Sequence, residues 1–153
     1  MADTVTAEVR SRMMAAVRSR DTKPELALRR ALHAAGFRFR VHSRIGKARP
    51  DIKLTRYRAA VFVHGCFWHG HDPCRLARRP KSNTGFWNGK IEGNMARDAR
   101  NLAELRAAGW RVAVVWECAI RGRDIGEVAA RLAAWVAGGE GDLEISGAQE
   151  AGR

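Results

Sequence analysis

The stretch Ala59-Ala60-Val61-Phe62-Val63-His64 decides the fold, because its first five residues are all apolar and it is short enough for one strand. Such a run lacks the alternation of a strand with one face in water, so we expect both faces to be covered and the strand to be central. A second stretch, Trp-Arg-Val-Ala-Val-Val-Trp at 110–116, predicts another buried strand. Buried strands separated by a helix favour a sheet with helices on its faces.

Working outward, hydrophobic periodicity and capping residues predict the remaining elements. Helices are expected over 5–18, 22–35, 86–108 and 124–136, and further strands over 37–41 and 51–55. The Gly-rich stretch 138–153 is expected to be a disordered tail. This leaves a single domain over 1–137, with basic N-terminal helices over 5–35. The expected fold class is α/β, with one mixed sheet flanked by helices.

Length and composition bound the class of protein. The chain has 153 residues, of which 46% are hydrophobic and 29% charged, as in one soluble globular domain. No stretch approaches the roughly 18–20 apolar residues of a membrane helix, and the N-terminus has no apolar signal core. We therefore expect a cytoplasmic protein with no membrane partner. Three cysteines also make a disulfide framework improbable.

The positive charge is concentrated in the first third of the chain. The formal net charge is +12, and the segment from Arg10 to Arg58 holds 15 Lys/Arg against three acidic residues. The remaining 13 basic and 13 acidic residues cancel. Charge of one sign at this density favours a polyanionic partner, most simply nucleic acid. A solvated basic surface that only aids solubility is the alternative.

Cysteine and histidine residues form a metal-binding pattern. Cys66, His71 and Cys74 lie within nine residues, and Cys118 follows the second buried strand. Three thiolates and one imidazole would close a structural zinc tetrahedron and order the loop that carries them. The alternative is three buried free thiols and a surface histidine.

Acidic and histidine residues at strand ends form a second pattern. Asp51 opens a predicted strand, His64 ends the next one, and His69 follows in the loop. A carboxylate beside imidazoles suits a Mg²⁺ site with proton transfer. Each residue also has a structural explanation: Asp51 as a turn residue, His64 as a satisfied strand-end histidine, His69 as a zinc ligand in place of His71. Glu25 fits the capping box of its helix.

Two aromatic pairs, Phe67-Trp68 and Phe86-Trp87, lie in polar, Gly-rich surroundings. Aromatic side chains that enter a base stack have this setting. A hydrophobic cluster over the zinc site would have it too.

Several of these motifs resemble the signature of the very short patch repair (Vsr) mismatch endonucleases. The strings are Val-Phe-Val-His-Gly-Cys-Phe-Trp-His (61–69), Arg-Pro-Asp (49–51), Phe-Trp (86–87), Asn94 with Arg97-Asp98, Gly-Trp-Arg-Val (109–112) and Val-Trp-Glu-Cys (115–118). The resemblance runs from about Arg10 to Val136. It implies a restriction-endonuclease-like core that nicks the T-containing strand of a T:G mismatch, which arises when 5-methylcytosine deaminates.

The resemblance also implies roles for individual residues. It makes Asp51 the Mg²⁺ ligand together with the backbone carbonyl of Val63, where the family often has Thr. His69 would activate the water, His64 would assist at the scissile phosphate, and Glu25 would close the site through water. The implied zinc ligands are Cys66, His71, Cys74 and Cys118. The implied DNA contacts are the intercalating Phe67, Trp68 and Trp87, the mismatch-facing Lys90 and Asn94, and the backbone-binding Arg18 and Arg20.

The sequence leaves rival functions open. One is a restriction-type nuclease that cuts both strands of an intact site, and another is a zinc-stapled nucleic-acid-binding module without catalysis. The expected partner is double-stranded DNA with a T:G mismatch, bound by a nucleoid-associated monomer. A MutL-type mismatch-repair protein and a cytosine-5 methyltransferase are open as protein partners, and the spacing from His71 to Cys74 leaves the zinc-loop geometry open.

Overall fold

In the computed structural model, which describes residues 22–71, 74, 77, 79–121 and 123–147, the centre of the fold is one mixed five-stranded sheet in the order β1-β2-β3-β4-β5. The strands are β1 (Arg40–Val41), β2 (Ile52–Leu54), β3 (Ala59–His64), β4 (Arg111–Trp116) and β5 (Leu143–Ile145). The pairs β1–β2 and β2–β3 are antiparallel, whereas the pairs β3–β4 and β4–β5 are parallel. The run at 59–64 is the central strand, as the sequence predicts.

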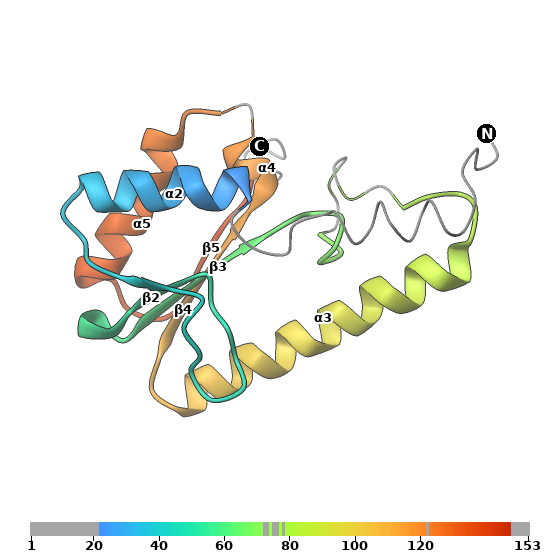
Figure 1. Ribbon diagram of the computed structural model, residues 1–153, viewed down its shortest axis with the longest axis horizontal. Coiled ribbons are helices and arrows are strands. Elements are labelled where there is room, and N and C mark those ends of the chain that lie inside the picture. Colours follow the sequence, from blue (N-terminus) through green and yellow to red (C-terminus); the bar gives the residue numbers. More distant parts are fainter. Residues whose placement is uncertain (1–21, 72–73, 75–76, 78, 122, 148–153) are drawn as a thin grey trace.

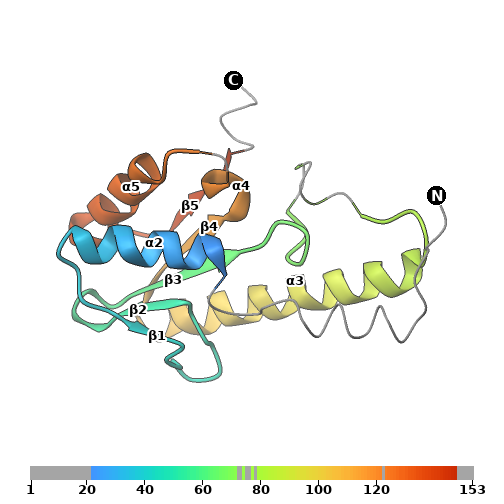
Figure 2. The same ribbon diagram turned by 45° about the horizontal axis from the view of Figure 1, so that its top comes forward.

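Helices cover both faces of the sheet and make three layers (Figures 1 and 2). They are α2 (Lys23–Ala34), α3 (Thr84–Ala107), the short α4 (Glu117–Ile120) and α5 (Ile125–Gly138), with a 3-10 turn at Thr55–Tyr57. Helices α2 and α5 bury Leu28 and Leu132 on one face, and α3 buries Leu105 on the other. Among the described helices none combines the length and the apolar character needed to cross a membrane.

The start of α2 follows from its capping residues. The Thr22 hydroxyl accepts a hydrogen bond from the backbone N–H of Glu25 at 3.4 Å, and Pro24 lies in the first turn. Gly36 follows the helix with a φ of +96°, a conformation that favours glycine. This local order matters for the site because it fixes Glu25 at the first turn of α2.

Two expectations about strands were wrong. Residues 138–153 were expected to be a disordered tail, but Leu143–Ile145 form β5, and the Ile145 side chain is 2% exposed. Parallel pairing with β4 stabilises this strand, which is too short for its sequence to show a period. The strand expected over 37–41 has only two residues, because Phe37 and Phe39 pack against the core from an irregular segment. The helix expected over 5–18 lies outside the described residues.

The register of the parallel strands β3 and β4 determines which residues lie together at one edge of the sheet. His64 pairs with Trp116 at the carboxyl ends of β3 and β4, so the segments after both strands leave from one edge of the sheet. Consecutive strand residues point to opposite faces. Val63 therefore faces the α2 side, where it packs against the core, and His64 faces the α3 side.

Candidate active site

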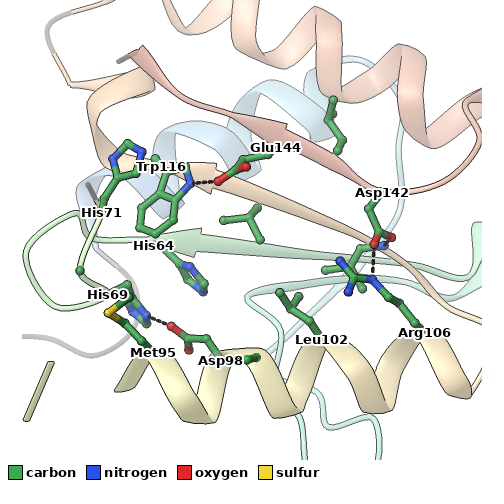
Figure 3. Close-up of a pocket in the computed structure, with 15 residues that line it drawn as sticks. His64, His69, His71, Met95, Asp98, Leu102, Arg106, Trp116, Asp142 and Glu144 are labelled. Carbon is green, nitrogen blue, oxygen red and sulfur yellow. Dashed lines mark hydrogen bonds and ion pairs between the residues drawn. The ribbon is translucent and has the colours of Figure 1, made fainter. Parts of the chain in front are cut away.

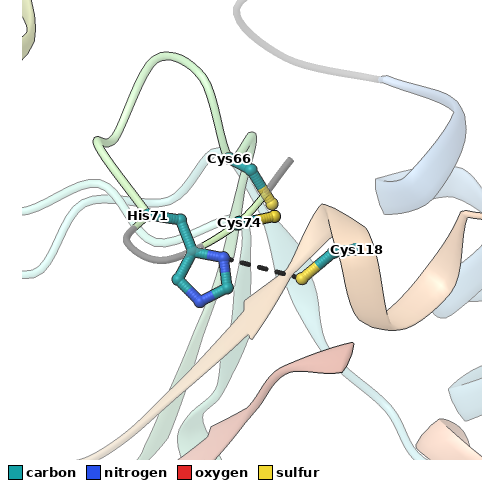
Figure 4. A group of neighbouring side chains, drawn as sticks. All are labelled: Cys66, His71, Cys74 and Cys118. Carbon is teal, nitrogen blue, oxygen red and sulfur yellow. Dashed lines mark hydrogen bonds between the residues drawn. The ribbon is translucent and has the colours of Figure 1, made fainter. Parts of the chain in front are cut away.

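The three cysteines and one histidine singled out in the sequence meet at this edge of the sheet (Figure 4). Cys66 and Cys118 each lie two residues beyond the paired ends of β3 and β4, and the loop returns His71 and Cys74 to them. The four ligand atoms all lie within 4.8 Å of one another. A zinc tetrahedron with Zn–S bonds of about 2.3 Å places its sulfurs about 3.8 Å apart, so the cluster has the size and the donor set for zinc.

The environment of the cluster also suits a cation. Burial raises the pKa of the Cys66 thiol, because a thiolate without a counter-charge is disfavoured away from water. A divalent cation supplies that counter-charge and deprotonates the thiols that bind it.

Two acidic residues meet on the α2 side of the sheet. The Asp51 carboxylate accepts a hydrogen bond from the backbone N–H of Val63 at 2.6 Å, which ties it to the end of β3. Glu25, 2% exposed, lies beside Asp51 and accepts a hydrogen bond from Arg29 at 2.8 Å. Glu25 therefore lies in the first turn of α2, as the capping pattern predicts, and at the same time beside Asp51, as the family resemblance implies.

The Asp51 carboxyl has a raised pKa. Burial is the main cause and the charge of Glu25 adds to it, so that the pKa rises from 3.8 to about 7 despite the hydrogen bond from Val63. Two carboxyl groups in one half-buried place disfavour double ionisation. A bound cation would remove that penalty by balancing the two negative charges. The pair also supplies carboxylate oxygens, which are the ligands that Mg²⁺ prefers.

The two histidines lie together on the opposite side of the sheet (Figure 3). The rings of His64 and His69 stack with their centroids 3.9 Å apart and their planes 3° from parallel. His69 Nδ1 lies 2.6 Å from a carboxylate oxygen of Asp98 on α3. Because a carboxylate only accepts hydrogen bonds, Nδ1 carries a proton, and in the neutral ring Nε2 is the nitrogen with the lone pair.

His64 is held uncharged. Burial lowers its pKa to about 3, with the charge of His69 as a smaller cause, so it is a neutral imidazole at ordinary pH. The Trp116 ring lies edge-on to His64 at 5.2 Å between centroids. These contacts fix the ring at the end of β3, beside His69.

Sequence reasoning assigned no role to Asp98. The sequence nevertheless held a sign of its position, because Asp98 lies three residues after Met95 and four before Leu102. This spacing places all three on the side of α3 that lines a cavity of about 560 Å³ (Figure 3). Both histidines open onto this cavity, which β4 and β5 close through Trp116 and Glu144. A lone acidic residue on the inner side of an amphipathic helix is the pattern that would have marked it.

The aromatic pairs from the loop and from α3 form one cluster. Phe67 lies 5.0 Å from Trp68 and 5.5 Å from Trp87 between ring centroids, and Phe86 lies 5.1 Å from Trp87. Trp87 is 7% exposed while Phe86 is 51% exposed. The rings cover one another in this conformation, so insertion of Trp87 into a duplex requires the cluster to open.

The residues expected to face a mismatch lie on the same helix. Lys90 is exposed, and Asn94 donates a hydrogen bond from Nδ2 to the carbonyl of Trp68 at 2.8 Å. Asn94 therefore holds the loop that carries Phe67 and Trp68. Arg18 and Arg20 lie outside the described residues, so their expected contacts with DNA stay predictions.

The fold is shared with a solved nuclease domain. The structure resembles the catalytic domain of the homing endonuclease I-Bth0305I with a TM-score of 0.51 and 20% sequence identity, over 76% of this chain and 97% of that one. At this identity the likeness shows the fold.

The chain belongs to the DNA mismatch endonuclease Vsr family. The model of that family matches residues 2–75. The chain is 40% identical to the DNA mismatch endonuclease Vsr of Escherichia coli K12 over 148 residues, which covers 95% of this chain and 94% of that protein. It is 49% identical to the type II nicking enzyme V.XorIIP of Xanthomonas oryzae pv. oryzae, over 86% of this chain and 95% of that enzyme. The resemblance seen in the sequence motifs is confirmed.

Proposed function

We propose that the protein nicks the T-containing strand at T:G mismatches left by deamination of 5-methylcytosine, by Mg²⁺-dependent phosphodiester hydrolysis. The observation that carries the proposal is that two groups of side chains lie near the carboxyl end of β3, one on each side of the sheet. Asp51 lies there against Val63 with Glu25 beside it, and His64 follows with His69 and Asp98. Carboxylates for a cation and an oriented imidazole are the groups that this hydrolysis needs.

The carboxylate side would hold the metal. Asp51 and the backbone carbonyl of Val63 are the proposed ligands, and Glu25 would act through water. When bound, Mg²⁺ supplies positive charge to the phosphate as negative charge develops on it. Val in place of the family's frequent Thr leaves this arrangement intact, because the carbonyl oxygen is the group used.

The histidine side would move the proton. Asp98 accepts the Nδ1–H of His69 and so orients the ring, which leaves Nε2 to take a proton from the attacking water. His64 lies against His69 as a neutral imidazole and would act at the scissile phosphate. A strand end, a loop and a helix thus hold the proposed base from three directions.

Recognition would combine stacking with hydrogen bonds. Phe67, Trp68 and Trp87 would enter the base stack, where a T:G wobble pair is weaker and more easily deformed than a matched pair. Lys90 and Asn94 would form hydrogen bonds with the mismatched bases. Arg18 and Arg20 would bind the phosphate backbone whatever the base sequence.

The Cys/His cluster would hold a structural zinc. Four protein ligands leave no open position for a substrate, so the ion would tie the loop after β3 to the segment after β4. This loop carries both His69 and the proposed intercalating residues Phe67 and Trp68, so zinc would support cleavage and recognition by ordering these three side chains.

The proposed substrate also suggests the setting in which the protein works. A T:G mismatch of this origin forms where a cytosine-5 methyltransferase has acted, so that enzyme and a MutL-type repair protein are the partner classes to test. We propose that the nuclease itself acts on nucleoid DNA as a monomer, since one chain contains both the carboxylate and the histidine groups.

Duplexes labelled on one strand or on the other test the proposal. We expect a cut in the T-containing strand of a T:G duplex with Mg²⁺, no cut with EDTA, and an intact G-containing strand. Cuts in both strands of a matched duplex would favour the restriction-type rival. Binding without any cut would favour the zinc-stapled binding module.

A further inference from the structure

We propose that Ser146, just beyond β5, holds the zinc-binding ring of His71 in the orientation and tautomer that the metal requires. The inference rests on the zinc site proposed above. It gives a role to the C-terminal segment, which composition alone had suggested to be disordered.

The two ring nitrogens of His71 face different partners. Nδ1 lies 3.6 Å from the Cys118 sulfur and so points into the cluster of ligands (Figure 4). Nε2, on the other side of the ring, lies 3.2 Å from the Ser146 hydroxyl oxygen. Ser146 is 3% exposed and His71 9% exposed, so little water competes for this contact.

This geometry selects one tautomer of His71. Zinc binds an imidazole through a lone pair, so Nδ1 must be unprotonated and the proton must be on Nε2. Nε2–H can then donate a hydrogen bond to the Ser146 oxygen. In the other tautomer, Nδ1–H would point at the metal position. A partner on the remote nitrogen is the usual means by which proteins orient a metal-binding histidine.

Further contacts show that the C-terminal segment is built into the site. Trp116 stacks on the His71 ring at 4.0 Å between centroids and 9° between planes. The indole N–H of Trp116 donates to Glu144 of β5 at 2.7 Å. A Cβ atom on Gly147 would lie 2.5 Å from the carbonyl oxygen of Cys118, so only glycine permits this approach. The face and the edge of the ring are therefore both held with help from residues 144–147.

The test is zinc affinity in competition with a chromogenic chelator, with metal content measured on the same samples. Ser146→Ala should weaken zinc binding about 10- to 100-fold, the usual effect of losing a partner of a metal-binding histidine. Ser146→Thr keeps a hydroxyl and should restore most of the affinity. Ser82→Ala, at an exposed serine in the segment before α3, is the matched control and should behave as the wild type.

The outcomes separate this inference from the zinc site itself. A wild-type protein without zinc would overturn the zinc proposal. Zinc-loaded wild type with Ser146→Ala holding zinc as tightly as Ser82→Ala would overturn the role of Ser146 alone. If Ser146→Ala does not fold, Ser146→Thr decides: wild-type affinity supports the hydroxyl contact, and a loss of about 10-fold or more contradicts it.

Discussion

Replacing Asp51 by Asn should abolish nicking and yet stabilise the metal-free protein at high pH. Asn keeps an oxygen that can accept the hydrogen bond from the Val63 N–H but removes the charge beside Glu25. The carboxyl pKa is about 7 in the folded protein and 3.8 in the reference state. Between these values the folded protein keeps a proton that the unfolded chain has lost. Stability of the wild type therefore falls as the pH rises through this range, and the loss is complete above about pH 7.

The size of the effect follows from the same values. Each pH unit between about 4 and 7 lowers the free energy of unfolding by up to about 1.4 kcal/mol. From pH 5 to pH 8 the advantage of Asp51→Asn over the wild type should thus grow by up to about 3 kcal/mol. Water near this half-buried carboxyl reduces the effect, so we expect about 1–2 kcal/mol, or roughly 3–8 °C in melting temperature.

The assay is thermal unfolding of both proteins in EDTA at pH 5 and pH 8. Comparing the two pH values cancels any effect of Asn that does not depend on ionisation. Glu140→Gln is the matched control, because Glu140 is an exposed carboxylate and its replacement should give no pH-dependent gain. A constant difference between Asp51→Asn and wild type at both pH values would refute the paired-carboxyl reasoning. Mg²⁺ at pH 8 should stabilise the wild type and leave the variant unchanged.

Three other substitutions separate the parts of the site. Asp98→Asn should lower the single-turnover nicking rate at least 10-fold with little change in DNA affinity, since a carboxylate only accepts a hydrogen bond whereas the Asn amide can also donate one and so no longer fixes the His69 tautomer; an unchanged rate would remove Asp98 from the account. Trp68→Ala should reduce the binding preference for T:G over C:G duplexes about 5- to 100-fold, because stacking on a base contributes about 1–3 kcal/mol; equal losses on both duplexes would mean that the ring only packs the loop. Cys118→Ser should lose zinc and stability together, and a folded variant with full zinc content would exclude the four-ligand site.

The sequence predicted the parts of the fold whose signal is local. The apolar run at 59–64, the capping pattern at Thr22 and the 24-residue α3 all have long or distinctive patterns, and the structure contains each of them. Strand β5 escaped prediction because three residues at the edge of a sheet are stabilised by pairing with β4 and by one buried side chain, Ile145. Neither cause leaves a periodic trace in the sequence.

The candidate site shows the same division. The four residues of the Cys/His cluster could be proposed as metal ligands because their residue types are distinctive, and the parallel register of β3 and β4 explains why Cys66 and Cys118 meet. Asp98 and Ser146 are of common residue types, so residue type alone did not mark them. Each acts through a single contact to a histidine far away in the chain, and such a contact depends on how the helix and the strand pack.

Strand cleavage on matched substrates tests the central claim most directly. The substrates are a T:G duplex and the C:G duplex that differs from it by one base, each labelled at the end of the strand that carries T or C. With Mg²⁺ the wild type should nick the T:G duplex at a single position and leave the C:G duplex intact, and Asp51→Asn should nick neither. Equal cleavage of both duplexes, or cleavage by Asp51→Asn at the wild-type rate, would contradict the account.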